Sequence, residues 1–393
     1  MNITPYWDSL SMILYIIMGV VPCIVMMQTQ KNNYGDNNNA KTYYCYYIAW
    51  YVLWLAFAVF RKVDYGVGGS DAIAYVTYFD VCLDPYSTHP YATHSDLLYA
   101  LLNKAIRLIT TDYHWLFFVI YSFLIIVYIE TIRKFNVKKA SVIPLALIVF
   151  LYLRGFTSIR TNLAAGLLLI SIILCFNENY VWSIFFAVGS VFMHKATIIY
   201  VLYLVLILLY KKKKLNIKTV LVFLVLSSVA SRLLQNLMLS TRMSFFESGA
   251  YYSYAQRSIG NSFFSGFWKI AFSQLLLLAF LVLFRKQIDQ YIEGLNEGEQ
   301  KKARFVRLIC YYDILLIPAT FIFDIWRGYE ILYLFRLMMW GIIIKSINQK
   351  FSVRTRGILN CIWFVGFIGW MIFRIYSTYE SSQLMPYIFS VFT

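Results

Sequence analysis

The stretch that decides the fold reads RGFTSIRTNLAAGLLLISIILCF (154–176), NENY (177–180) and VWSIFFAVGSVFMHK (181–195). Two apolar runs flank a short polar break, which predicts two membrane helices joined by a tight turn. Arg154, Arg160, His194 and Lys195 bracket the pair. Ionisable groups at membrane depth are costly and usually face a bundle interior or a wet cavity, although a cation at a helix end can also reach out to lipid headgroups. Because all four fall on one side of the membrane, they favour a site over separate anchors.

The composition of the whole chain is that of a membrane protein. Of the 393 residues, 60% are hydrophobic and 14% are charged, whereas soluble domains are about 25% charged. The formal charge of +16 comes from lysines and arginines interleaved with apolar runs. Membrane topology and contact with anionic lipid explain this excess better than nucleic-acid binding does. The six cysteines form no CxxC pair, so we expect neither a disulfide framework nor a thiolate metal site.

Apolar windows predict an all-α, polytopic bundle of about twelve transmembrane helices. The first run, Ser11 to Met27, is expected to be a retained span rather than a cleaved signal. The expected spans cover 9–28, 44–60, 113–132, 140–154, 160–176, 180–193, 196–210, 217–236, 267–284, 307–325, 329–345 and 358–376. Basic residues gather in every second loop, and the positive-inside rule makes these loops cytoplasmic.

The opposite, outer face then receives segments 61–112 and 237–266, which we expect to form the site of a single membrane unit spanning residues 1–393. The sequence from His94 predicts an amphipathic helix lying in the membrane interface. Its apolar stripe contains Leu97, Leu98, Leu101, Leu102, Ala105, Ile106 and Ile109, with Asn103, Lys104 and Arg107 turned away.

The outer face carries charge but few familiar catalytic motifs. No Walker A, GxGxxG, HExxH or GxSxG pattern occurs. Arginine dominates, and its planar fork suits a phosphate or carboxylate at a membrane surface. Glycines in GVGGSD permit a tight turn that can bring Asp71 close to a ligand, and His194 suits acid or base catalysis. No carboxylate or histidine cluster has metal-ligand spacing, so we expect no metal and no cofactor.

Four sequence motifs together resemble the Wzy/EpsG family of bacterial polysaccharide polymerases. The first is R(x)nGSDxxxY after the second expected span, which begins at Arg61 and contains Asp71 and Tyr75. The others are SIRTNLAAG from Ser158, FMHKATIIY from Phe192 and YEILYLFR from Tyr329. The resemblance implies a membrane fold of the C-type glycosyltransferase (GT-C) kind. It also implies an enzyme at the periplasmic face of the bacterial inner membrane that joins undecaprenyl-diphosphate-linked repeat units into O-antigen, capsule or exopolysaccharide.

The resemblance also suggests roles for particular residues. Asp71 or His194 would deprotonate the acceptor hydroxyl, and the sequence does not rank the two. Diphosphate binding would fall to Arg160 together with one or more of Arg154, Arg257 and Arg327, and Lys195 and Tyr75 would complete the substrate site. The partners implied are the lipid-linked donor and acceptor glycans, membrane lipid, a chain-length regulator and a flippase.

Two other functions remain open from the sequence. A lipid-linked oligosaccharide flippase should carry charges deep within many spans and show an internal repeat, whereas here the charges gather on one face. An O-antigen ligase is chemically close to a polymerase but commonly has one large outer loop, and segment 237–266 is only moderate in length.

Overall fold

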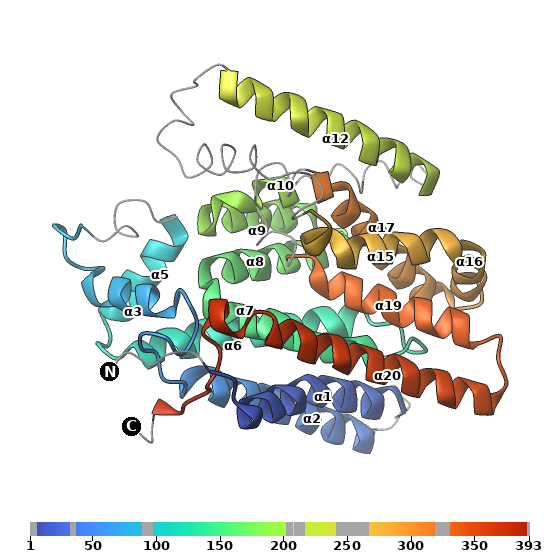
Figure 1. Ribbon diagram of the computed structural model, residues 1–393, viewed down its shortest axis with the longest axis horizontal. Helices are drawn as coiled ribbons and strands as arrows, with labels where there is room; N and C mark the ends of the chain where they lie inside the picture. Colours follow the sequence, from blue (N-terminus) through green and yellow to red (C-terminus); the bar gives the residue numbers. More distant parts are fainter. Residues whose placement is uncertain are drawn as a thin grey trace. The chain divides into compact units, whose positions relative to one another are not determined.

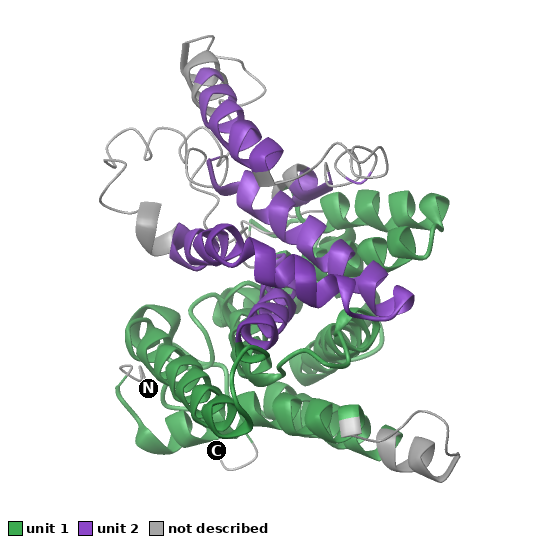
Figure 2. Ribbon diagram, turned by 90° about the vertical axis from the view of Figure 1, so that its right-hand side faces the viewer, with its two compact units in different colours: residues 1–195, 348–393 green, residues 196–347 purple. Residues whose placement is uncertain are grey.

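The computed structural model describes residues 6–31, 37–88, 97–201, 207, 217–240, 267–318 and 331–390. Regular structure in these residues is helical and includes no strand (Figure 1). The chain divides into two compact units (Figure 2). Unit 1 comprises residues 1–195 and 348–393, and unit 2 comprises residues 196–347. The all-helical membrane class predicted from the sequence is confirmed.

Unit 1 contains most of the described helices. Its helices are α1 (Ser9–Lys31), α2 (Asn37–Val59), α3 (Ala72–Val81), α5 (Leu97–Arg107), α6 (Tyr113–Phe135), the 3-10 helix η1 (Ile143–Ile148), α7 (Val149–Thr157), α8 (Ile159–Phe176), α9 (Tyr180–Met193), α20 (Val353–Tyr376) and α21 (Tyr379–Ser382).

The long helices of unit 1 pack through side chains that suit close approach. The indole of Trp54 in α2 donates to the carbonyl of Met18 in α1 over 3.2 Å. A Cβ at Gly166 of α8 would lie 2.7 Å from the ring of Phe123 in α6, so these helices meet where α8 has no side chain. Such contacts place α6 in the interior, where most of its residues are buried.

Several segments predicted to lie outside gather at one end of unit 1. The carbonyl of Phe60, just after α2, accepts a hydrogen bond from the amide of Ser390 over 2.7 Å. Ser390 in turn contacts His114, in the first turn of α6, and Trp7 before α1 packs against Tyr376 at the end of α20. We call this the loop end of unit 1.

Unit 2 contains α10 (Ile198–Val201), α12 (Ile217–Ser240), α15 (Phe267–Leu283), α16 (Arg285–Glu293), α17 (Glu297–Leu315) and α19 (Tyr333–Asn348), and the 3-10 helix η2 (Lys195–Thr197) precedes them. A buried ion pair joins α19 to α17, with Nε of Arg336 3.0 Å from Oδ2 of Asp313. Gln274 of α15 donates to Oδ1 of the same carboxylate over 3.1 Å. The carboxylate of Asp313 is thus buried next to two polar partners.

The number of membrane spans is not settled by helix length. Four helices in the described residues are long and apolar enough to cross a membrane, namely Ser9–Gln30, Tyr113–Phe135, Ile159–Phe176 and Val353–Tyr376. A fifth would be the pair Ala271–Leu283 and Arg285–Glu293, which is bent by 75°. Other expected spans are shorter helices, among them Tyr180–Met193, or reach outside the described residues. The figure of about twelve spans stays a prediction.

Helix α5 differs from its prediction in the side that it buries. Tyr99, Asn103 and Ile106 are buried, whereas Leu97 and Leu101 of the expected apolar stripe are more than half exposed. Asn103 therefore does not turn away from the protein, and its side-chain amide donates to the carbonyl of Tyr99 over 2.8 Å. The exposed leucines still suit a helix at a membrane interface.

Candidate active site

The break between α7 and α8 carries two of the predicted arginines. Ser158 leaves the helical conformation (φ −150°, ψ 53°), so Arg154 lies in the last turn of α7 and Arg160 in the first turn of α8. The Ser158 side chain does not cap α8, and its buried Oγ has no hydrogen-bond partner among the described residues. A cation near a helix N-terminus is disfavoured by about 0.3–1 kcal/mol, so helix stability does not explain Arg160.

The glycine loop, residues 66–70, lies against this break. Gly68 and Gly69 have φ of +88° and +117°, which residues with a side chain rarely adopt. A Cβ at Gly69 would clash with the carbonyl oxygen of Phe156, in the last turn of α7. The loop therefore approaches α7 backbone to backbone. Asp71 follows it directly and stands half-buried at the N-cap of α3, beside the segment that carries Arg154.

His194 ends the helix that packs beside α8. Ser171 of α8 and Ser183 of α9 exchange hydrogen bonds, with each hydroxyl donating to the other's carbonyl over 2.6 and 2.8 Å. Arg160 lies eleven residues before Ser171, and His194 lies eleven residues after Ser183. Because both helices rise about 1.5 Å per residue, we infer that His194 and Arg160 lie level at the loop end. Lys195, which is exposed, follows His194 directly.

Tyr75 lies inside the contact between α3 and α5. Its side chain is only 1% exposed, and its ring packs edge-on against Tyr99 with centroids 5.9 Å apart. The ring of Tyr78 stacks on that of Tyr99, with centroids 6.0 Å apart. These tyrosines hold α3, and with it Asp71, against α5. A direct contact between Tyr75 and substrate stays a prediction.

Arg61 is the residue of the loop end that the predicted site omitted. It is 1% exposed, and its guanidinium lies 3.8 Å from the ring centroid of Phe156 and 4.4 Å from that of Phe117. Its Nη1 donates to the hydroxyl of Tyr121 over 3.2 Å. We call Arg61 with these three rings the Arg61 box. The sequence marks Arg61 as an outer-face charge and as the arginine of the first motif, but only the aromatic residues of α6 and α7 could have hinted at its burial.

Arg257 and Arg327 lie outside the described residues. In the part of the chain that the structure describes, no group of three or more histidine, cysteine, aspartate or glutamate side chains could hold a metal ion. The expectation of metal-free catalysis stays a prediction.

A family model described as the EpsG family matches residues 43–389, which is most of the chain. The chain belongs to the EpsG family. Its resemblance to polysaccharide polymerases, first indicated by short motifs, is thereby confirmed. No curated protein and no solved structure matches the chain.

EpsG membership supports the prediction of a polymerase-like protein of polysaccharide biosynthesis. The family consists of polysaccharide polymerase-like proteins, and it suggests a glycosyltransferase-like polymerase in polysaccharide biosynthesis. The apolar helices agree with a location in a membrane. Within the EpsG match lie the glycine loop, the α7–α8 break, His194 and the Arg61 box.

Proposed function

We propose that this EpsG-family protein joins undecaprenyl-diphosphate-linked oligosaccharide repeat units at the outer face of the bacterial cytoplasmic membrane. The growing glycan would pass from its lipid carrier to the non-reducing end of a new unit. The observation that carries the proposal is the meeting of the glycine loop with the α7–α8 break. It brings the loop that precedes Asp71 against the end of α7, next to the break that Arg154 and Arg160 flank, in a protein of the polymerase-like family.

The α7–α8 break suits a diphosphate. The first amide groups of α8 have no partner within the helix, and the helix dipole favours an anion at this end. Ser158 does not occupy the position with its side chain. Arg160 adds a planar fork that can bind phosphate oxygens bidentately, and fixed cations stabilise the charge that develops on a departing diphosphate. This arrangement supports departure of the leaving group without a metal ion.

The transfer itself needs a base for the acceptor. The acceptor hydroxyl oxygen would attack the anomeric carbon of the donor as the bond from that carbon to the diphosphate oxygen breaks. The hydroxyl proton would pass to Asp71 or His194, and the electron pair of the broken bond would leave with the diphosphate. Attack opposite the leaving group inverts the anomeric centre. Both candidate bases belong to the loop end of unit 1, where the arginines of the break also lie.

Arg160 provides the test of this proposal. Arg160→Ala should lower polymer formation at least about tenfold, because hydrogen bonds to a charged group are worth about 1.5–3 kcal/mol. Arg160→Lys keeps the charge but loses the fork, so we expect partial activity. The ladder of surface polysaccharide in strains that carry each substitution, at equal membrane abundance of the protein, measures both effects.

Arg133 provides a matched control for Arg160, because it lies in the last turn of α6, away from the loop end. Arg133 is an exposed arginine paired with Glu130 over 2.6 Å, and Arg133→Ala should leave the ladder complete. A complete ladder from Arg160→Ala would remove Arg160 from the site. Equal full activity of both Arg160 variants would instead favour a simple anchor to the headgroups. Purified protein that fails to join lipid-linked units but moves them across vesicles would make it a transporter.

A further inference from the structure

The segment 382–390 is hydrogen-bonded to both ends of the stretch that contains the glycine loop. The amides of Gly69 and Ser70 donate to the carbonyls of Gln383 and Ser382 over 3.0 and 2.9 Å. At the other end, the amide of Lys62 donates to the carbonyl of Ile388 over 2.8 Å. The backbone groups of the loop, which no helix satisfies, are thus satisfied by a segment more than 300 residues away in sequence.

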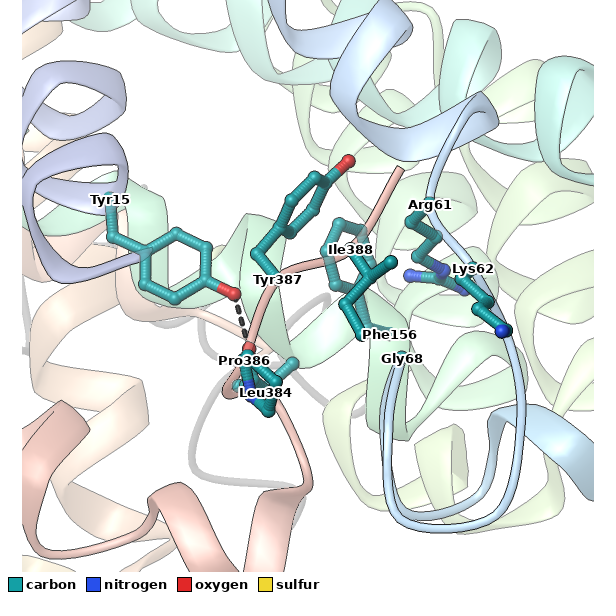
Figure 3. Close-up of a pocket in the computed structure, with 9 residues that line it drawn as sticks. All are labelled: Tyr15, Arg61, Lys62, Gly68, Phe156, Leu384, Pro386, Tyr387 and Ile388. Atoms are coloured by element: carbon teal, nitrogen blue, oxygen red, sulfur yellow. Dashed lines mark hydrogen bonds between the residues drawn. The ribbon is translucent and has the colours of Figure 1, made fainter. Parts of the chain in front are cut away.

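Helices α1 and α2 hold this segment in place, and Figure 3 shows the contact from Tyr15 of α1 to Leu384. The hydroxyl of Tyr15 in α1 donates to the carbonyl of Leu384, and the hydroxyl of Tyr387 donates to the carbonyl of Phe57 in α2. The amide of Tyr387 donates to Oγ of Ser11 over 2.7 Å. Burial raises the pKa of the Tyr387 hydroxyl well above its usual value, so this group stays a hydrogen-bond donor at physiological pH.

The Arg61 box lies next to segment 382–390 and the glycine loop, because Arg61 and Phe156 line a small pocket together with Tyr387 and Gly68. Nε and Nη2 of Arg61 are buried and have no hydrogen-bond partner among the described residues. They lie at a pocket lined also by Gly68, Phe156 and Tyr387, with room for little more than a water molecule. Such a pocket admits neither a phosphate nor a sugar ring. Arg61 therefore holds Phe156 and the adjacent loop by cation–π contact rather than by binding substrate.

We propose that segment 382–390 is a positioning element of the transfer reaction. It fixes the glycine loop, and hence Asp71, against the α7–α8 break, while Arg61 fixes Phe156 on the other side of the same contact. The inference rests on the proposed function, in which Asp71 lies at the site of transfer. A catalytic group displaced by about 1 Å can lose up to about a hundredfold in rate, so a clamp of this kind acts on the chemical step.

Asp112, His114 and Ser390 form a row of contacts at the end of segment 382–390 that is similar to a hydrolytic site. His114 lies between Asp112 and Ser390, with Nδ1 2.6 Å from the carboxylate and Nε2 3.1 Å from the Ser390 hydroxyl. The order matches a serine nucleophile with its base and orienting carboxylate. The Ser390 hydroxyl, however, donates to the carbonyl of Phe60, and the Asp112 side chain is 53% exposed. This geometry fastens the end of the segment to α6 and supports the positioning role.

The test removes single hydroxyl groups and leaves the rings. Tyr387→Phe removes the hydrogen bond to the carbonyl of Phe57, and Tyr15→Phe removes the hydrogen bond to the carbonyl of Leu384. Tyr47→Phe is the matched control, because the Tyr47 hydroxyl contacts the sulfur of Met26 between the same two helices, away from the loop end. Each purified full-length protein is examined by amide hydrogen exchange and by initial rates with lipid-linked repeat units, in buffer containing a chelator.

The positioning role predicts a specific pattern in these measurements. The rate of amide hydrogen exchange at Gly69 and Ser70 should rise about tenfold in Tyr387→Phe and in Tyr15→Phe but not in Tyr47→Phe. The kcat should fall about tenfold while KM for the donor stays within twofold, because positioning acts on the chemical step. Equal kcat in all variants despite faster exchange would overturn the positioning role, as would unchanged exchange. A wild-type protein that joins no lipid-linked units would refute the proposed function. The hydrogen-exchange measurement would still show whether segment 382–390 holds the glycine loop.

Discussion

Asp112 begins α6 with a carboxylate at the positive end of the helix. Its Oδ1 accepts hydrogen bonds from the amide of His114 over 3.0 Å and from the His114 ring over 2.6 Å. Partial burial raises the pKa of this carboxyl, but the hydrogen bonds from His114 outweigh burial and hold the pKa below its usual value. A carboxyl whose pKa is lowered by folding stabilises the folded state above the pKa that it has in the unfolded chain, about 3.9.

Asp112→Asn should therefore change stability in a pH-dependent way. At pH 6 we expect the variant to be less stable by a few tenths of a kcal/mol to about 1 kcal/mol, since asparagine still caps the helix but lacks the charge. The difference should shrink as the pH falls below about 4 and through the lowered pKa of Asp112, because the wild-type carboxylate then takes up a proton and loses its charge. Thermal unfolding of both proteins in detergent between pH 3 and pH 7 measures it. A difference that stays constant over this range would assign the effect to packing.

At the scale of residues, the sequence predicted charges at helix ends but not what surrounds them. Arg154, Arg160 and His194 were visible because each interrupts or ends an apolar run. The burial of Arg61 depends on rings in α6 and α7, and the role of Tyr387 depends on a carbonyl in α2. Neither contact leaves a local signal, since no periodicity or spacing links residues so far apart in the chain.

Helices α1 and α20 contain glycines in opposite surroundings. A Cβ at Gly19 of α1 would lie 2.7 Å from the carbonyl oxygen of Ala146 in η1 and 3.1 Å from the sulfur of Met371. A Cβ at Gly369 of α20 would meet nothing within 4 Å. The first glycine permits close packing of helices, and the second has no packing role in unit 1.

The two glycines predict opposite effects of alanine. Gly19→Ala should destabilise the protein by about 1–3 kcal/mol, because the backbone of η1 must shift to admit the methyl group. Gly369→Ala should be neutral or stabilising by up to about 1 kcal/mol, because alanine favours the helix. The temperature of unfolding of each purified variant measures both. Equal losses from the two substitutions would mean that the α1–η1 contact is not tight.

At the scale of elements, hydropathy located the apolar cores of helices better than their ends. The span expected from residue 307 belongs to α17, which starts at Glu297, where Asn296 caps it by accepting from the amide of Glu299 over 2.9 Å. This first part is polar, so an apolar window cannot detect it. The break at Ser158 was predicted within a few residues. The short helix α3 was not, because its place depends on packing against α5.

At the scale of the molecule, the alternation of basic loops predicts which side faces the cytoplasm. Ser87 follows α3 near the loop end of unit 1, and Lys301 lies in α17 among the basic residues expected inside. The orientation in the membrane stays a prediction. So does the expectation that residues 1–393 work as one membrane protein without a separate domain.

Cysteine labelling tests the orientation. In a background with the exposed Cys45 and Cys361 replaced by alanine, we expect Ser87→Cys to react with an impermeant thiol reagent in intact spheroplasts. Lys301→Cys should react only after the membrane is opened, because the basic stretch that contains it is expected on the cytoplasmic side. Labelling of Lys301→Cys in intact spheroplasts would contradict the predicted orientation.

The pairing of Phe60 with Ser390 also has a consequence in time. These residues are 330 positions apart, and ribosomes add about 5–20 residues per second, so the loop region waits on the order of tens of seconds for its partner. During that interval α1, α2 and the helices after them can enter the membrane, while the amides of Gly69 and Ser70 are left to water or to other groups. Translation that terminates before residue 382 would thus release a chain whose apolar helices are inserted but whose glycine loop is not held.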